Sequence, residues 1–202
     1  MDFLRKPTPY KDESLLSYLY RFSDANAILL EWPLNKLSIK TSIKNINFLN
    51  DYKHIEKIAN VTSKDIEQIK NMTFNKYNSH HIFYKKQDRY IYKIDEYYYN
   101  TCRKNDPFYN EYMMLFHEVK FCPDCLKEDR YHRLHWSFYQ TKICIKHKKI
   151  LQKNCGYCGK EVDIRDIVNG TCSCNNDLAE NNSISCEDEC IYNTQVVILK
   201  NL

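Results

Sequence analysis

The chain has 202 residues, with 30 Lys and Arg against 26 Asp and Glu, so its formal net charge is +4 at pH 7. Residues 1–174 are mildly basic and residues 175–202 are acidic, a balance that permits contact with nucleic acid without requiring it. No stretch approaches the roughly 18 apolar residues of a membrane span, and no apolar signal segment begins the chain. We therefore expect a cytoplasmic protein of one large domain or two small ones.

The first predicted element is a helix over residues 12–27. Asp12 or Ser14 can cap its N-terminus, and apolar residues then recur along it at helical spacing. Pro7 and Pro9 precede it, and a residue before proline favours extended backbone. An extended arm is therefore expected to lead into this helix.

Two further helical patterns follow, at Tyr52–Asn60 and Ser63–Met72. Val61-Thr62-Ser63 joins them as a short turn, with Ser63 placed as the N-cap of the second helix. The pair outlines a helix-turn-helix at about residues 52–72, whose second helix would contact DNA. Helix pairs with short turns are also common in helical cores, so a packing role stays open.

The segment 74–121 is dense in Tyr and Phe. Within it, Arg89–Ile94 alternates between side-chain types with the period of a strand. Aromatic residues mixed with basic ones can stack on bases, but a core role is the simpler interpretation. Residues 1–120 are expected to form a helical N-terminal domain that contains the helix-turn-helix.

Eight residues in the second half form four closely spaced pairs of metal-binding type. The pairs are Cys122 with Cys125, Cys144 with His147, Cys155 with Cys158, and Cys172 with Cys174. Two such pairs supply the four ligands of a tetrahedral zinc ion, and a complete set leaves no position for water or substrate. The pattern predicts two structural zinc ions in a tandem zinc-finger module over residues 121–178.

The simplest arrangement is sequential, with the first two pairs on one ion and the last two on the other. A cross-brace, in which the first and third pairs share an ion, stays open. So does the replacement of Cys172 and Cys174 by Cys186 and Cys190. In a reducing cytosol the spacing indicates metal rather than disulfides. Packing or surface roles are expected for His117, His132, His135 and Cys102.

The end of the chain predicts an exposed acidic loop over Asn175–Asn193 and the start of a helix over residues 194–202. The expected fold class is therefore mainly α, with small β and zinc-knuckle elements. The sequence has no Gly-rich phosphate loop, acidic nuclease cluster, catalytic zinc helix or nucleophile elbow. We expect no enzymatic activity.

The segment Phe121–Cys158 resembles the zinc-finger region of the TniQ family, which includes TnsD-type target selectors. Cys172–Leu178 is similar to the segment that closes this region, and the N-terminus is similar to the family's opening helix. The shared motifs are Cys-Pro-x-Cys-Leu at 122–126, Glu128-Asp129, Arg133-Leu134, Trp136, the Cys-x-x-His and Cys-x-x-Cys-Gly pairs, and, at the N-terminus, Pro9-Tyr10, Glu13-Ser14-Leu15, Ser17-Tyr18-Leu19 and Arg21.

This resemblance implies a non-enzymatic role in choosing the target of DNA transposition. TniQ-like proteins link a target-recognising component to a AAA+ ATPase of the TnsC/TniB type, which then licenses the transposase. Some members bind double-stranded DNA themselves, and others associate with an RNA-guided CRISPR effector. The resemblance also implies a bacterial cytoplasmic protein, associated with the nucleoid when it acts. Many members continue into a long helical region, so the chain is expected to be a short member or a truncated one.

Candidate DNA contacts lie in two places. On the second helix of the pair, Lys64 can meet phosphate, and Gln68 and Asn71 can read adenine edges. Phosphate contacts are also expected around the first zinc set, from Arg130, Arg133, Lys146, Lys148 and Lys149. A solvated surface charge is the alternative for each, and Arg133 can instead be a structural pairing residue. A stand-alone sequence-specific DNA-binding protein and a zinc-stabilised protein-interaction module remain alternative functions.

Overall fold

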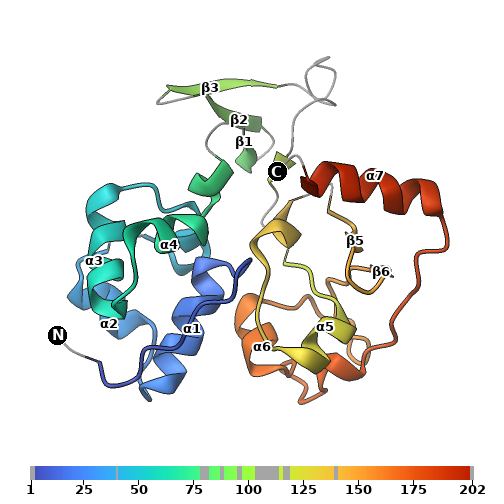
Figure 1. The fold of residues 1–202 in the computed structure, drawn as a ribbon, viewed down its shortest axis with the longest axis horizontal. Helices are drawn as coiled ribbons and strands as arrows, with labels where there is room; N and C mark the ends of the chain where they lie inside the picture. Colours follow the sequence, from blue (N-terminus) through green and yellow to red (C-terminus); the bar gives the residue numbers. More distant parts are fainter. Residues whose placement is uncertain are drawn as a thin grey trace.

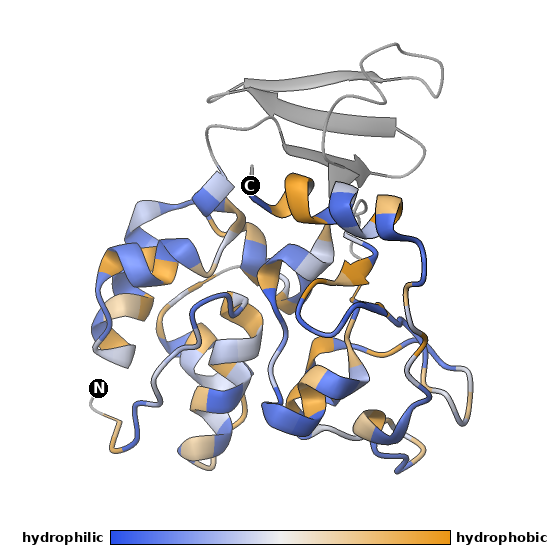
Figure 2. Cartoon of the chain, turned by 45° about the vertical axis from the view of Figure 1, so that its right-hand side comes forward, coloured by the Kyte–Doolittle hydropathy of each residue, from blue (hydrophilic) through white to orange (hydrophobic). Residues whose placement is uncertain are grey.

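The computed structural model describes residues 3–39, 41–77, 82–86, 89–94, 97–102, 114–115, 119–138 and 141–200. The chain is mainly helical, as the sequence predicts (Figure 1). Figure 2 shows hydrophilic and hydrophobic residues alternating along the helices, as expected for helices with one face in a core. No helix among these residues is long and apolar enough to cross a membrane.

The N-terminal part consists of short helices. The α-helices are α1 (Leu15–Ala25), α2 (Glu31–Lys36), α3 (Tyr52–Thr62) and α4 (Ile66–Asn71), and the 3-10 helices are η1 (Ile43–Phe48) and η2 (Phe74–Tyr77). The predicted first helix is confirmed, with Ser14 as its N-cap. Its buried face, which includes Leu15, Tyr18 and Phe22, packs into the core.

The turn between α3 and α4 differs from the prediction. Helix α3 continues to Thr62, whose hydroxyl donates to the Ile58 carbonyl at 2.7 Å. Ser63 then takes a left-handed conformation with φ of 51° and ends α3. The prediction of Ser63 as an N-cap was therefore wrong, and Asp65 is the residue that precedes α4. The cause is the left-handed residue, which sequence spacing does not reveal.

A four-stranded sheet follows, in the order β3-β2-β1-β4. Its strands are β1 (Ile82–Lys86), β2 (Arg89–Ile94), β3 (Tyr97–Cys102) and β4 (Met114–Leu115). Strand β2 has the bounds that the sequence predicts. It pairs antiparallel with β1 and β3, and β4 pairs parallel with β1.

The C-terminal part is built from short elements around the cysteines. The helices are α5 (Pro123–Glu128), η4 (Leu134–Ser137), α6 (Ile164–Asn169), η5 (Leu178–Glu180) and α7 (Glu189–Lys200). The strands β5 (Ile143–Cys144) and β6 (Lys149–Ile150) form a two-stranded sheet. The prediction of an exposed loop over Asn175–Asn193 was wrong in part. Leu178 and Ala179 are buried beside the cysteines, and α7 begins at Glu189, five residues earlier than expected.

The two parts share their cores. Ile164 of α6 packs in the core of the N-terminal helices, and Phe74 and Tyr77 pack with Leu134 and Phe138. Backbone bonds also join them, since Ser14 donates to the His132 carbonyl at 2.9 Å. The helical part and the cysteine-rich part are thus held together by burial and by hydrogen bonds.

Candidate metal centres and nucleic-acid contacts

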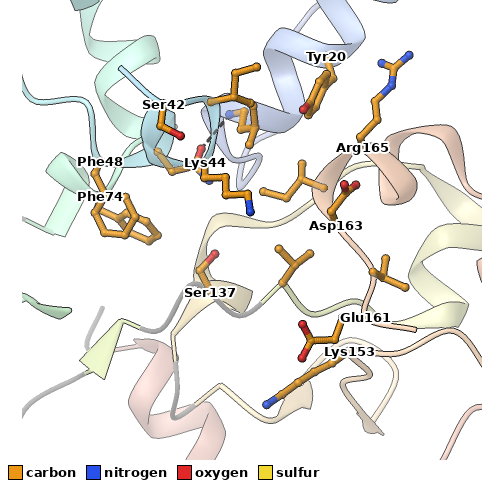
Figure 3. A pocket seen from close by; sticks show the side chains of 16 residues that line it. Tyr20, Ser42, Lys44, Phe48, Phe74, Ser137, Lys153, Glu161, Asp163 and Arg165 are labelled. Carbon is orange, nitrogen blue, oxygen red and sulfur yellow. Dashed lines mark hydrogen bonds between the residues drawn. The ribbon is translucent and has the colours of Figure 1, made fainter. Parts of the chain in front are cut away.

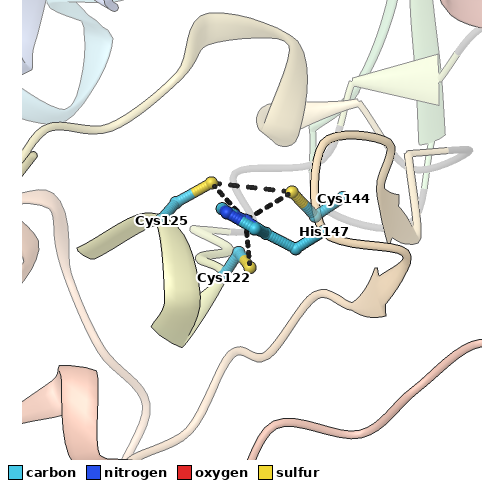
Figure 4. Close-up of side chains that lie close together, drawn as sticks. All are labelled: Cys122, Cys125, Cys144 and His147. Atoms are coloured by element: carbon cyan, nitrogen blue, oxygen red, sulfur yellow. Dashed lines mark hydrogen bonds between the residues drawn. The ribbon is translucent and has the colours of Figure 1, made fainter. Parts of the chain in front are cut away.

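The first cluster contains Cys122, Cys125, Cys144 and His147, whose ligand atoms all lie within 4.8 Å of one another (Figure 4). The Sγ atoms of Cys125 and Cys144 are 3.5 Å apart, and His147 Nδ1 lies 3.3 Å from Cys125 Sγ. A tetrahedral zinc ion with metal–ligand bonds of about 2.1–2.3 Å has ligand-to-ligand edges of about 3.5–3.8 Å. The set therefore fits such an ion.

Local sequence explains how these side chains come together. Cys122 precedes α5 and Pro123 occupies its first turn, where proline's fixed φ suits a helix start. Cys125 follows one turn later, so both sulfurs lie at the same end of α5. The hairpin of β5 and β6 brings Cys144 and His147, and Lys148 closes its turn with φ of 52°.

Glu128 is a contact of the first cluster to which the sequence assigned no role. Its Oε1 lies 3.1 Å from His147 Nε2, while Nδ1 of the same ring faces the sulfurs. With Nδ1 as the ligand, Nε2 carries the proton and donates it to the carboxylate, which fixes the ring. Lys146 pairs with the other oxygen of Glu128. The sequence signal was its place in the Glu128-Asp129 motif, three residues after Cys125.

The second cluster contains Cys155, Cys158, Cys172 and Cys174. Cys155 Sγ lies 3.7 Å from Cys174 Sγ, and Cys158 Sγ lies 3.6 Å from Cys172 Sγ, again the edges of a zinc tetrahedron. The structure thus groups the four pairs sequentially, and Cys186 and Cys190 lie outside both clusters. Gly159, with φ of 72°, follows the knuckle in a conformation that favours glycine.

The sulfurs of the first cluster are hydrogen-bonded to one another. Bonds from the Cys122 and Cys125 thiols lower the pKa of Cys144. A thiolate is the form that binds metal. Both clusters consist of ligands of the kind and number that a metal ion needs, and neither leaves an open position.

The other histidines lie apart from the clusters. His132 is fully buried, with Nδ1 3.1 Å from the Ser14 hydroxyl, and burial lowers its pKa to about 3. His135 packs edge-on against Trp136. Both therefore have packing roles, as expected. His117 lies outside the described residues, and Cys102 ends β3.

The two arginines proposed as phosphate contacts have partners within the chain. Arg133 is 10% exposed in its side chain and pairs with Asp12 at 3.1 Å. Its guanidinium lies over the rings of Tyr131 and Trp136, 4.4 and 4.8 Å from their centroids. Arg130 donates to the Asn169 carbonyl and pairs with Asp177. These contacts favour the structural pairing role for Arg133. Arg130 is a partly exposed surface charge that has partners within the chain.

The three lysines near the first cluster also have partners. Lys146 pairs with Glu128, and Lys148 pairs with Glu189 at 3.2 Å. Lys149 donates to the Ser185 hydroxyl at 2.8 Å. A phosphate would compete with these contacts, although exposed pairs of this kind are weak.

The candidates of the second helix differ among themselves. Gln68 and Asn71 lie on α4, but the prediction that Lys64 lies on this helix was wrong, because α4 begins at Ile66 and Lys64 lies in the turn before its N-cap Asp65. Gln68 returns to the start of the helix, where its Oε1 accepts from the Asp65 amide at 3.1 Å, which is half of a capping box. Lys64 and Asn71 make no side-chain hydrogen bond or ion pair with the described part of the chain. All of the side-chain polar groups of these two candidates are therefore without a partner among the described residues, whereas only the Nε2 group of Gln68 is.

The fold and the two clusters define a class: a helical protein with two compact Cys/His sets of metal-binding type. A family model described as TniQ matches residues 4–151, so the chain belongs to the TniQ family. A search of curated proteins gives no match. The match includes the arm, the helices and the first cluster. Membership connects the chain with DNA transposition, in target selection or DNA binding, and with a family of non-catalytic adaptors.

Proposed function

We propose that this chain is an adaptor of transposition target selection that links DNA, or an RNA-guided target complex, to a AAA+ ATPase regulator of the transposase. The observation that carries the proposal is the family match over residues 4–151. The matched parts are bonded to one another, as when the Leu134 amide donates to the Asp12 carbonyl at 2.9 Å. An adaptor must hold two partners in a fixed relation, and a rigid unit of this kind supports that role.

Each cluster holds a structural zinc ion in this proposal. The first would use three thiolates and His147 Nδ1, and the second four thiolates. Bound zinc would supply local folding free energy, which in zinc-finger peptides is about 10–16 kcal/mol. Since each set of four is complete, the ions would have no place for substrate.

DNA contact is assigned to α4 in this proposal. Lys64, in the turn before α4, and Asn71, on the helix, have polar groups without a partner in the described part of the chain. The five basic residues near the first cluster have partners within the chain. A lysine that meets phosphate gives salt-dependent affinity without sequence choice, and an asparagine can read an adenine edge. Gln68 can read an adenine edge with both ends of its amide only by giving up the bond that its Oε1 accepts from Asp65.

A pull-down tests the adaptor role. The full chain, loaded with zinc, is immobilised and mixed with the AAA+ ATPase encoded beside it, a DNA duplex, and either ATP or ADP. Retention that needs both ATP and the duplex is the expected result. The same ATPase, incubated with beads that carry no chain, is the control.

Two other outcomes would overturn the adaptor role. Tight binding to one duplex sequence, with no retention of the ATPase, would make the chain a stand-alone DNA-binding protein. An absence of DNA binding even at low salt, where phosphate contacts are strongest, together with no retention of the ATPase, would favour a protein-interaction module.

A further inference from the structure

A cleft lies between the N-terminal helices and the second cluster. We propose that it binds an extended peptide segment of a partner protein, one that carries an apolar side chain beside an acidic one. The cavity has a volume of about 780 Å³, which is within the range of ligand pockets. Residues of α1, η1 and η2 line one side, and the segment 161–165 lines the other (Figure 3).

The cleft has apolar and aromatic walls. Tyr20, Phe48 and Phe74 contribute rings from the helical side, and Val162 and Ile164 contribute aliphatic side chains from the other. Binding of an apolar side chain that displaces water from such walls is favourable. They account for the apolar half of the proposed ligand.

Asn47 provides a donor that is open to this cleft. The residue is 5% exposed, and its Oδ1 accepts from the Leu16 amide at 2.8 Å. This bond fixes which end of the amide faces Leu16, so Nδ2 is turned away from it. Nδ2 has no hydrogen-bond partner in the described part of the chain. An unpaired donor in the lining of a cleft can be met by a ligand that brings an oxygen acceptor.

Further unpaired groups line the same space. The Ser137 residue is 8% exposed, and its hydroxyl and the Lys44 amine have no partner among the described residues. Figure 3 shows both groups pointing into the cavity, with Glu161 on the other side. The Glu161 carboxylate is likewise unpaired within the described chain. Arg165 is occupied by Asp24 at 2.8 Å.

This distribution of donors and acceptors matches a peptide. A peptide backbone offers carbonyl oxygens to Asn47 and Ser137 and an N–H group to Glu161, and an acidic side chain can pair with Lys44. Glu161 and Asp163 lie among Lys153 and Arg165 in the lining, so the cleft offers both signs of charge and not the uniformly positive surface that a phosphate backbone selects. The chemistry of the cleft therefore favours a protein partner, whatever the function of α4.

The test uses random seven-residue peptides on phage, panned against the full zinc-loaded chain. Selected peptides are synthesised with a fluorescent label, and their affinity is measured by anisotropy. We expect sequences that combine apolar residues with Asp or Glu. Lys44→Glu should weaken their binding at least about 10-fold, and Ser42→Trp should weaken it by bulk at the rim of the cleft.

Lys36→Glu is the matched control, because Lys36 is an exposed lysine of α2 that does not line the cleft. It should leave peptide affinity unchanged, and circular dichroism should show all three variants folded. Three results would overturn the proposal: no peptide selected above background, peptides that bind Lys44→Glu and Ser42→Trp as they bind the original chain, or displacement of the peptides by a single-stranded oligonucleotide.

Discussion

The phenol ring of Tyr10 stacks on that of Tyr131, with centroids 4.1 Å apart and planes within 5° of parallel. The two residues are far apart in the sequence, one on the N-terminal arm and one beside the first cluster. Tyr10 also donates to Asp129 at 2.8 Å, and Tyr131 donates to Asp12 at 2.8 Å. Each tyrosine thus donates a hydrogen bond to a carboxylate that lies two residues from the other tyrosine in the sequence.

Cations extend this stack on both sides. Arg21 lies over the outer face of Tyr10 at 4.4 Å from its centroid, and Arg133 lies between Tyr131 and Trp136. Arg21 is held by Glu13, which is fully buried, at 2.6 Å. The motifs that resemble the TniQ family at the two ends of the match therefore meet in a single stack. Their function in this chain is to join the arm and α1 to the cysteine-rich part.

Arg133→Ala is expected to destabilise the fold by about 3 kcal/mol. Removing one partner of a buried ion pair costs about 3–5 kcal/mol; we take the low end because Asp12 is a third exposed. Chemical unfolding of both proteins measures the loss. Arg5→Ala is the control, since Arg5 is exposed and its guanidinium has no partner in the described chain. If Arg133→Ala left stability unchanged and weakened DNA binding, Arg133 would instead be supported as a phosphate contact.

Some features could be predicted because they depend on short-range sequence alone. The strand Arg89–Ile94 and the helix after Ser14 follow from periodicity and capping, and the cysteine pairs from ligand spacing. The partners of Arg133 and Lys148 could not be predicted, because Asp12 and Glu189 come from distant parts of the chain. The same holds for the cleft, whose walls meet only after folding. A basic residue in a sequence thus says little about whether it is free for phosphate.

Metal content tests the two clusters separately. The purified chain should contain two zinc ions by elemental analysis, and chelation should unfold the cysteine-rich part. Cys125→Ser should remove one ion and Cys155→Ser the other, because each loss opens one closed set. Cys186→Ser is the control and should keep both ions. A Cys125→Ser chain that retains two ions would refute the first cluster as a zinc site.

Glu128→Ala should weaken zinc binding at the first cluster by about 10- to 100-fold, the usual effect of removing a carboxylate that orients a ligating histidine. Competition with a chromophoric chelator measures this affinity. Glu128→Gln should retain part of it, because its carbonyl oxygen can still accept from His147 Nε2. Glu189→Ala removes a comparable Glu–Lys pair from the same hairpin and should have no effect. Equal losses in the Glu128→Ala and Glu189→Ala chains would mean that Glu128 does not orient the ligand.

Because His132 is buried in its neutral form, we expect the folded chain to lose stability in acid. Burial lowers its pKa to about 3 in the folded chain, against about 6.5 when unfolded. The unfolded state therefore binds an extra proton as pH falls below about 6.5, and stability falls with it. Between pH 7 and pH 5 this contributes about 2 kcal/mol. His132→Gln should show a shallower loss than the original chain in chemical unfolding, with His54→Gln as the control. Parallel curves for His132→Gln and the original chain would contradict the buried neutral state.

Lys64→Glu tests whether α4 meets DNA. If the amine contacts phosphate, the change should weaken duplex binding about 10-fold at low salt and lower the dependence of log K on log salt by about one. The comparison is Lys36→Glu, which makes the same charge change on α2 and should cost less. Affinities measured at two salt concentrations separate a direct contact from a change in net charge, since both variants share the latter. Equal affinities for Lys64→Glu and Lys36→Glu at both concentrations would remove Lys64, and with it the start of α4, from the DNA interface.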